Sequence, residues 1–245
     1  GIRGSMEDVS VTHEILAVLD GHGGRECAEF IAPQLGRLAM LTQDHWVKAF
    51  TELDDAFRAQ GQPSGCTCVM VALGTKFVQV AHIGDSRAVL FRTGSVVAHT
   101  VDHKPGSAEE RERITRCGGK VQDSESGPSR IAGVAVSRAF GTFISPMGRQ
   151  VLKDPDLPHS ERLVSCVPEL ASWPTERGDL LVLACDGVWD VLSEAEVAEI
   201  VCGTLAEDSA HWDVAKSARM IIERALEFST DNVSCIVAEL GGPVP

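Results

Sequence analysis

The sequence contains neither a CxxC pair nor an HExxH segment, which are the spacings most typical of zinc sites. Cys66 and Cys68 are one residue apart, and this spacing suits a strand with one side chain on each face better than a chelating turn. A GxxxxGKS/T phosphate loop is also missing, which argues against a P-loop nucleotide hydrolase. No hydrophobic stretch approaches roughly 18 residues and no signal peptide is visible, so we expect a soluble protein without a membrane partner.

The chain is also short of positive charge. Of its 245 residues, 22 are Lys or Arg and 35 are Asp or Glu, which gives a formal net charge of -13. Such a chain is a poor candidate for binding nucleic acid, although bound divalent cations would offset part of the charge locally. The eight cysteines have no disulfide-scaffold spacing, and Cys68, Cys185 and Cys235 lie in apolar runs. This favours free thiols in a reducing compartment and an intracellular location, cytoplasmic or nuclear.

Acidic residues stand where strand-like runs end. Ile15–Leu19 is followed directly by Asp20, and Leu180–Ala184 ends two residues before Asp186. Each Asp precedes a Gly, which lets the backbone approach a ligand, although an Asp-Gly pair on its own is more typical of a turn. Further acidic residues beside strand-like runs are Glu7, Asp8, Asp102 and Asp231. Because Mg²⁺ and Mn²⁺ prefer oxygen ligands, this pattern predicts a hard-metal site.

Five segments with helical spacing alternate with groups of strand-like runs. The predicted helices are Gly24–Met40, His45–Phe57, Ala108–Cys117, Glu194–Leu205 and Asp213–Glu227, and the fourth begins with a capping box formed by Ser193 and Glu196. Strand-like runs joined by short turns are Cys68–Leu73, Phe77–Ile83, Ala88–Phe91 and Val96–Thr100. Helices in pairs between hairpin-linked strands favour an α+β fold with packed antiparallel sheets.

The ordered motifs of the chain resemble those of the type 2C metal-dependent protein phosphatases. In chain order they are Arg3 with Met6-Glu7-Asp8, Asp20-Gly21-His22-Gly23-Gly24, Ser64-Gly65-Cys66-Thr67, Gly84-Asp85-Ser86-Arg87, Asp102-His103-Lys104-Pro105, Val136-Ser137-Arg138-Ala139-Phe140-Gly141, Asp186-Gly187-Val188-Trp189-Asp190 and Asp231-Asn232. The resemblance covers nearly the whole chain. It implies one catalytic domain over residues 1–245, built as a four-layer α-β-β-α sandwich in which two antiparallel sheets are flanked by helix pairs.

The resemblance also implies a centre with two Mg²⁺ or Mn²⁺ ions. By the family pattern, Asp20 bridges the two ions, and Asp186 and Asp231 complete the first. Glu7 and the carbonyl group of Gly21 bind the second. Clustered carboxylates repel one another unless cations neutralise them, so the pattern is physically consistent.

Three more acidic residues receive supporting roles from the resemblance. Asp8 orients the metal shell by hydrogen bonding. Asp102, together with Asp186 and with Asp190 as a further ligand, forms a weaker third-metal site. Each of these carboxylates considered alone would be assigned to a turn or a solvated surface.

The implied reaction is direct in-line hydrolysis of phosphoserine or phosphothreonine in a protein, without a covalent enzyme intermediate. Water held between two cations is acidic enough to supply the nucleophile. Arg3 is the expected clamp for the phosphoryl oxygens, because a guanidinium offers paired planar donors. His22 is the expected acid for the departing oxygen. The implied partners are phosphorylated proteins, and the family precedent is a monomer.

Some positions depart from the family pattern, and others are expected to have a structural role. Thr142 stands where the family usually has Asp, which predicts an altered flap with an intact metal centre, and Cys66 replaces the usual Ser or Thr in a buried place. Members commonly have a further strand before the arginine motif, which the sequence given does not include. Asp85 is expected to fix a tight turn, Arg138 to pair with carboxylates behind the site, and Trp189 to lie in the core.

The least regular stretch, residues 141–168, contains four prolines and is predicted to be a surface insert near the site. It lies where the family has a variable flap, so we expect substrate choice to reside in Ile144, Met147, Arg149 and Lys153. Two other functions stay open. One is a pseudophosphatase that binds a partner without chemistry, which the complete set of metal carboxylates disfavours. The other is a metal-dependent hydrolase of nucleotides or small phosphate esters.

Overall fold

The computed structural model describes residues 3–12, 14–40, 42–125, 127–146, 148, 150–204 and 212–241. One sheet has five antiparallel strands in the order β1-β2-β5-β6-β12, and a second has four in the order β14-β13-β7-β8. The bounds of these strands are β1 Val9–Thr12, β2 Ile15–Leu19, β5 Cys68–Leu73, β6 Phe77–Ile83, β7 Arg87–Arg92, β8 Ser95–His99, β12 Glu169–Pro174, β13 Leu180–Ala184 and β14 Cys235–Glu239.

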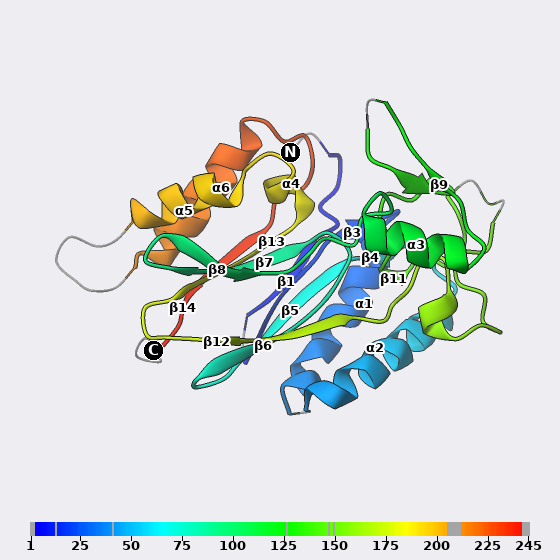
Figure 1. The fold of residues 1–245 in the computed structure, drawn as a ribbon, viewed down its shortest axis with the longest axis horizontal. Helices are drawn as coiled ribbons and strands as arrows, with labels where there is room; N and C mark the ends of the chain where they lie inside the picture. Colours follow the sequence, from blue (N-terminus) through cyan, green and yellow to red (C-terminus); the bar gives the residue numbers. More distant parts are fainter. Residues whose placement is uncertain are drawn as a thin grey trace.

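Helices cover the outer faces of both sheets (Figure 1). The helices are α1 Glu26–Leu35, α2 Gln43–Arg58, α3 Ala108–Arg116, α4 Asp186–Trp189, α5 Glu194–Cys202 and α6 Val214–Leu226. The first pair, α1 and α2, packs on the five-stranded sheet, and the pair α5 and α6 packs on the four-stranded sheet. The predicted four-layer α-β-β-α sandwich is therefore confirmed.

Alternation along the central strands explains why the two sheets pack. On β2, Leu16 and Val18 face the other sheet, whereas Ile15 and Leu19 face the helices. Successive side chains of a strand point to opposite faces, so an entirely apolar strand suits a layer that is covered on both sides. The strands β2 and β13 are buried along their whole lengths and form the centre of the molecule.

The short strands and the insert lie at the end of the sandwich where the site is formed. β3 Gly21–His22, β4 Gly65–Cys66 and β11 Phe140–Gly141 make a three-stranded sheet, and β9 Val121–Gln122 pairs with β10 Arg130–Ile131. Between residues 141 and 168 the structure has one 3₁₀ turn, His159–Glu161, among the described residues. The expected insert is thus irregular in structure, as its composition predicts.

Most predicted element boundaries are shifted by a few residues. The predicted helix Gly24–Met40 is divided into α1 and a 3₁₀ turn at Gly36–Met40, and the fourth helix ends at Cys202. Its capping box is confirmed, because Ser193 accepts from the Glu196 N–H while the Glu196 carboxylate accepts from the Ser193 N–H. No helix in the described part of the chain has the length and apolar character needed to cross a bilayer.

Candidate metal centre

Asp20 and Asp186 come together because they follow the central strands of different sheets. Asp20 lies directly after β2, and Asp186 begins the short helix α4 just after β13. Ligand-type atoms of Asp20, Asp186 and Cys185 all lie within 4.8 Å of one another. The packing of the two sheets therefore creates the carboxylate pair that the sequence predicts.

These carboxylates are held in an environment that disfavours their charge. Burial, followed by repulsion from Asp186 and Asp8, raises the pKa of Asp20 well above its usual value. Burial is also the main reason why the pKa values of Asp8 and Asp186 are raised. Both oxygens of Asp8 are buried and lack a well-formed hydrogen bond to the described residues. A group of partly or fully buried, mutually repelling oxygen donors is suited to a hard divalent cation.

Cys185 is a member of this cluster that the sequence analysis did not single out. Burial raises the pKa of its thiol far above the usual range, so the sulfur is not a thiolate. Its Sγ accepts a hydrogen bond from the Ser234 N–H at 3.2 Å and donates to the Asn232 carbonyl oxygen at 3.4 Å. Cys185 therefore supports the backbone next to Asp231, and the carboxylates remain the donors suited to a cation.

Glu7 and Gly21, the two residues predicted to bind the second ion, lie in close backbone contact. A Cβ atom at Gly21 would lie 2.4 Å from the Glu7 carbonyl oxygen, so only glycine fits there. The Glu7 carboxylate accepts from Ser5 Oγ at 3.1 Å and from the Gly24 N–H at 3.3 Å. The Glu7 N–H in turn donates to the side chain of Asn232 at 3.0 Å. This places Glu7 and Asp8 against the loop between α6 and β14.

Arg3 reaches the centre but is engaged by one of its carboxylates. Its Nη2 lies 2.5 Å from Asp231 Oδ2, and both side chains are partly exposed, at 52% and 31%. The second oxygen of Asp231 accepts from the Asn232 N–H at 2.7 Å. Arg3 thus stands beside the carboxylates, where a phosphate clamp is expected, with its guanidinium bound to Asp231.

His22 contacts Thr142, the residue that replaces the usual acidic one. His22 Nε2 lies 2.7 Å from Thr142 Oγ1. Burial, and then the charge of Lys153, lower the pKa of His22 to about 4, so the ring is neutral near pH 7. A role as acid therefore requires an anion beside the ring to raise this pKa. Thr142 itself has a left-handed backbone, with φ of 56°.

Two of the three residues predicted for the third site, Asp102 and Asp190, are bound to cationic side chains. Asp102 accepts from Arg87 Nε and Nη2, each at 2.9 Å. Lys104 Nζ lies 2.6 Å from Asp190 Oδ1 and 3.8 Å from Asp102 Oδ2. The ammonium group of Lys104 therefore occupies the space between these two carboxylates, a role that the sequence analysis did not assign to it.

Asp85 also belongs to this acidic region. It is 5% exposed, and burial followed by repulsion from Asp186 raises its pKa to about 8. The sequence analysis expected Asp85 only to fix a turn. Its position in the Gly84-Asp85-Ser86 link after β6, at the same end of the sheets as Asp20, could have shown that it faces the centre.

The carboxylates open into a groove of about 1140 Å³. Arg3, Asp20, His22, Asp186 and Asp231 line one part of it, together with Asp85, Asp190 and Thr142. The loop after β11 lines another part. The centre is thus accessible to a substrate much larger than a phosphate ion.

A family model described as Protein phosphatase 2C matches residues 3–233 of the chain. The chain belongs to the protein phosphatase 2C family. A curated mouse relative, Probable protein phosphatase 1N, is 36% identical over 273 residues that cover 100% of this chain and 64% of that protein. Probable protein phosphatase 2C 59 of Arabidopsis thaliana is 32% identical over 259 residues, which cover 97% of this chain and 76% of that protein.

A solved phosphatase from a pathogenic strain of Toxoplasma gondii has a similar fold. Its TM-score is 0.79 at 27% sequence identity, with 98% of this chain and 90% of that chain covered. The chain spans less than two thirds of the length of the mouse relative. The comparisons therefore place the chain in the phosphatase 2C family and leave its own activity to be proposed.

In the flap of this phosphatase 2C chain, the prediction for Lys153 is wrong. Ile144 is exposed and lines the groove, whereas Met147 and Arg149 lie outside the described residues. Lys153 was expected to face a substrate, but it is fully buried, with Nζ 2.6 Å from Asp54 Oδ1. Its charge is stabilised by this internal partner, so Lys153 supports the loop and does not contact a substrate.

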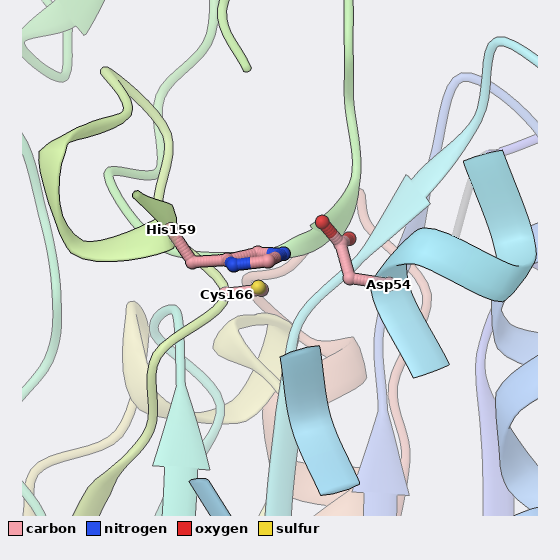
Figure 2. Close-up of side chains that lie close together, drawn as sticks. All are labelled: Asp54, His159 and Cys166. Carbon is pink, nitrogen blue, oxygen red and sulfur yellow. The ribbon is translucent and has the colours of Figure 1, made fainter. Parts of the chain in front are cut away.

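A second group of ligand-type side chains lies beside this ion pair. Figure 2 shows Asp54, His159 and Cys166, whose ligand atoms lie within 4.8 Å of one another. Burial raises the pKa of Cys166 to about 12, and Asp54 is already bound to Lys153. Since the thiol is neutral and a cation is present, this group is a structural polar cluster in the phosphatase fold.

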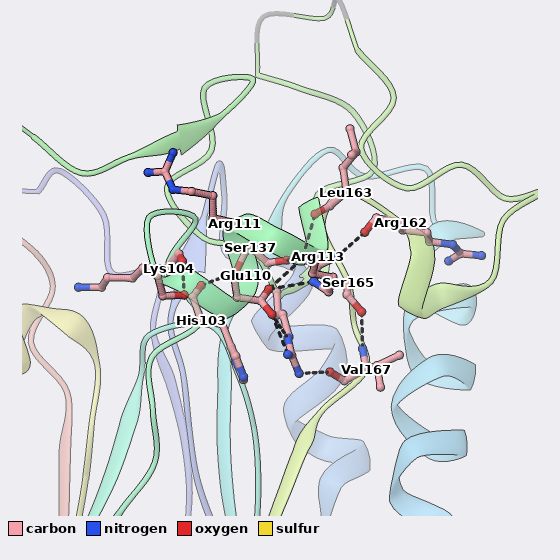
Figure 3. Close-up of polar contacts among 12 residues, drawn as sticks. His103, Lys104, Glu110, Arg111, Arg113, Ser137, Arg162, Leu163, Ser165 and Val167 are labelled. Atoms are coloured by element: carbon pink, nitrogen blue, oxygen red, sulfur yellow. Dashed lines mark hydrogen bonds and ion pairs between the residues drawn. The ribbon is translucent and has the colours of Figure 1, made fainter. Parts of the chain in front are cut away.

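Arg138 pairs with a carboxylate behind the site, as predicted. Its Nη2 lies 2.7 Å from Glu110 Oε1, and Arg113 binds the other oxygen of the same carboxylate at 2.9 Å. Figure 3 shows Arg113 also reaching the carbonyl oxygens of Arg162 and Leu163. Arg113, which is held by Glu110, therefore connects α3 to the insert. The predictions that Trp189 lies in the core and that Cys66 is buried are also confirmed, at 7% and 0% exposure.

Proposed function

We propose that this chain is a metal-dependent protein serine/threonine phosphatase that hydrolyses phosphoserine and phosphothreonine residues directly, without a covalent intermediate. The observation that carries the proposal is the meeting of Asp20 and Asp186 from two different sheets in a partly buried cluster whose charges repel one another. The family of the chain supports the same activity. Phosphorylated proteins are the proposed substrates.

The proposed cofactors are two Mg²⁺ or Mn²⁺ ions. Asp20 would hold both ions, Asp186 and Asp231 would complete the first, and Glu7 with the Gly21 carbonyl would bind the second. When bound, such ions lower the pKa of a water molecule and so supply the nucleophile. A third ion near Asp102 and Asp190 would have to displace the ammonium group of Lys104.

Asp8 is proposed to orient the donors around it. Its carboxylate lies deep in the cluster, and its charge interacts with Asp20 and Asp231. A buried carboxylate that lacks a good donor of its own is stabilised when hydrogens on bound water point towards it. Asp8 would thus fix the positions of those hydrogens without binding an ion directly.

Arg3 and His22 are proposed to act on the phosphoryl group. Asp231 can bind either Arg3 or a cation with Oδ2, so cation binding would free the guanidinium for the phosphoryl oxygens. His22 would hold a proton for the departing oxygen once the phosphoryl anion raises its low pKa. Thr142 Oγ1, at 2.7 Å, keeps the ring in place.

The test is the initial rate of phosphate release from a phosphothreonine peptide, with Mn²⁺ or Mg²⁺ titrated against EDTA. Metal-dependent release that is lost in Asp186→Asn is the expected result. Asp123→Asn removes one exposed carboxylate that is paired with Arg111 outside the groove and serves as the matched control. A folded wild-type protein that releases no phosphate at millimolar metal would instead support a binding protein without catalysis. Comparable rates on nucleotides and peptides would support the hydrolase of small phosphate esters.

A further inference from the structure

The groove that contains the metal carboxylates has a second part with different chemistry. This part is lined by Arg58 at the end of α2, by Arg130 on β10, and by the apolar residues Val134, Phe143, Ile144 and Val151. Val134 and Phe143 are buried, at 6% and 9% exposure, so they belong to its wall. A substrate bound at the carboxylates would have room to place neighbouring residues here.

Ile144 and Val151 form the exposed apolar surface of this part. They pair across an isolated antiparallel bridge, so their side chains lie next to each other on the same face. Their exposed fractions are 59% and 55%, although both are β-branched apolar residues that are usually buried. Two adjacent exposed apolar side chains at the side of a groove are suited to cover an apolar side chain of a bound peptide.

Arg58 supplies a positive charge beside this surface. Its Nη2 donates to the Lys153 carbonyl oxygen at 2.8 Å, and its guanidinium carbon lies 4.1 Å from the centre of the Phe143 ring. Its Nε is buried without a hydrogen bond. No carboxylate of the described residues forms an ion pair with Arg58, whereas Arg3 in the same groove is bound to Asp231. Arg58 therefore retains a charge that an acidic ligand can neutralise.

Arg58 is linked through Phe143 to the part of the groove that contains His22. Phe143, on which the guanidinium rests, directly follows Thr142, whose hydroxyl group contacts His22. A substrate residue at Arg58 would therefore lie only a few peptide positions from the phosphorylated residue. Arg130 is a second cation of the groove, and its Nη1 donates to the Gly133 carbonyl oxygen at 2.9 Å.

We propose that the groove selects phosphorylated polypeptides that present an apolar side chain to Ile144 and Val151 and a carboxylate side chain to Arg58. This rests on the function proposed above. The net charge of the chain is -13 and the carboxylates at the centre repel anions until cations bind, so an unpaired arginine in this groove gives a local preference for acidic residues. The proposal assigns specificity to these three side chains and leaves the chemistry at the metal carboxylates unchanged.

The test uses phosphothreonine peptides on an alanine background, with Leu or Glu placed singly at each of three positions on either side of the phosphothreonine. For wild-type protein with Mn²⁺ we expect one position at which Leu raises kcat/KM by about 10-fold. At another position Glu, but not Gln, should raise it by about 3- to 10-fold at low salt, and added salt should reduce this gain. No preference for either residue at any position would overturn the proposal.

Enzyme variants assign each preference to its side chain. Arg58→Gln should lose the preference for Glu and keep the preference for Leu. Arg58→Glu should prefer Lys at the position where wild-type protein prefers Glu. The double variant Ile144→Ser with Val151→Ser should lose the preference for Leu and keep the preference for Glu. Lys76→Gln, in the exposed turn between β5 and β6, is the control for loss of one cation. A Glu preference that persists in both Arg58 variants, or a loss of both preferences together, would contradict the assignment.

Hydrolysis of a small aryl phosphate separates this inference from the proposed function. It contains no flanking residues, so its metal-dependent turnover should stay within about twofold in all these variants, because they do not touch the metal carboxylates. A wild-type protein that hydrolyses neither substrate would refute the proposed function itself. Turnover of the aryl phosphate without any peptide preference would refute only the proposed selection.

Discussion

Lys153 Nζ lies 2.6 Å from Asp54 Oδ1, and neither side chain exposes any surface to solvent. The same Asp54 oxygen accepts from the Gly141 N–H at 2.8 Å, and Lys153 also donates to the Ala139 carbonyl oxygen at 2.7 Å. This ion pair therefore connects α2 to the backbone on both sides of Phe140. That backbone leads directly to Thr142 and so to the imidazole of His22.

Removing the lysine should be strongly destabilising, because it would leave the buried Asp54 carboxylate with Arg162 Nη1, 3.9 Å from Oδ2, as its remaining cationic partner. We expect Lys153→Met to lower the free energy of unfolding by about 3–5 kcal/mol, measured by urea unfolding in EDTA. The double variant Lys153→Met with Asp54→Leu should recover a large part of this loss, since both charges are then absent. A loss below about 1 kcal/mol in the single variant would show that the pair contributes little.

The ion pairs of Glu110 predict how stability depends on pH. Burial opposes ionisation of Glu110, but its bonds to Arg138 and Arg113 outweigh this and lower its pKa from 4.5 to about 2. A lowered folded-state pKa gives stability that is present above the unfolded pKa of 4.5 and is lost as the pH falls towards 2. Glu110 should therefore contribute about 2 kcal/mol of the decrease in unfolding free energy between about pH 5.5 and pH 3.

Urea unfolding at those two pH values tests this. In Glu110→Gln the decrease should be smaller than in wild-type protein by that amount. Glu109→Gln is the matched control, since Glu109 is exposed on the same turn of α3. Equal decreases in the Glu110 variant and in wild-type protein would mean that the two arginines do not stabilise the ionised form.

The features that could be predicted from the sequence depend on residues that are close together in it. The capping box of Ser193 and Glu196 involves residues three apart, and the apolar strands β2 and β13 show their burial in their composition. Asp20 and Asp186 could be placed at strand ends for the same reason. The ordered motifs then supplied their roles as expectations.

The features that could not be predicted are ion pairs between residues that are far apart in the sequence. Lys153 occurs in an irregular, charged segment that is typical of a surface, and its partner Asp54 is 99 residues away in sequence. Likewise, Arg3 meets Asp231 across 228 residues. Whether a charge is buried depends on the position of its partner, and that position is set only when the layers pack. Lys104, between Asp102 and Asp190, was missed for the same reason.

Neutralising Asp20 should have opposite effects on stability and activity. Its pKa is raised by burial and then by repulsion from Asp186 and Asp8, so its ionised form destabilises the protein when no cation is bound. We expect Asp20→Asn to raise the free energy of unfolding in EDTA by about 1–2 kcal/mol near pH 8 and to abolish phosphate release. The gain should shrink at lower pH, because wild-type Asp20 then becomes protonated and loses its unfavourable charge.

The same unfolding experiments with Mn²⁺ should reverse the order of stability. Wild-type protein should be stabilised as the metal concentration rises, since a ligand that binds only the folded state shifts the equilibrium. Asp20→Asn should respond much less, and Asp123→Asn should respond as wild-type protein does. If Asp20→Asn is less stable than wild-type protein in EDTA, the repulsion between these carboxylates is not the dominant effect of this side chain.

Gly65 provides the space in which His22 and Thr142 meet. A Cβ atom at this position would lie 1.9 Å from Thr142 Oγ1, 2.6 Å from His22 Nε2 and 2.8 Å from the Phe140 carbonyl oxygen, so these groups would have to move. We expect Gly65→Ala to lower kcat for a phosphothreonine peptide by about 100-fold, because a displacement of about 1 Å at a reacting group has that cost. Stabilisation by Mn²⁺ in thermal unfolding should remain, since the metal carboxylates are not displaced.

Gly36→Ala is the matched control, because a Cβ there meets no atom within 4 Å. Unchanged kcat in Gly65→Ala would show that the position of the imidazole is not important for turnover, and loss of the Mn²⁺ response would show that the substitution had reached the metal centre instead.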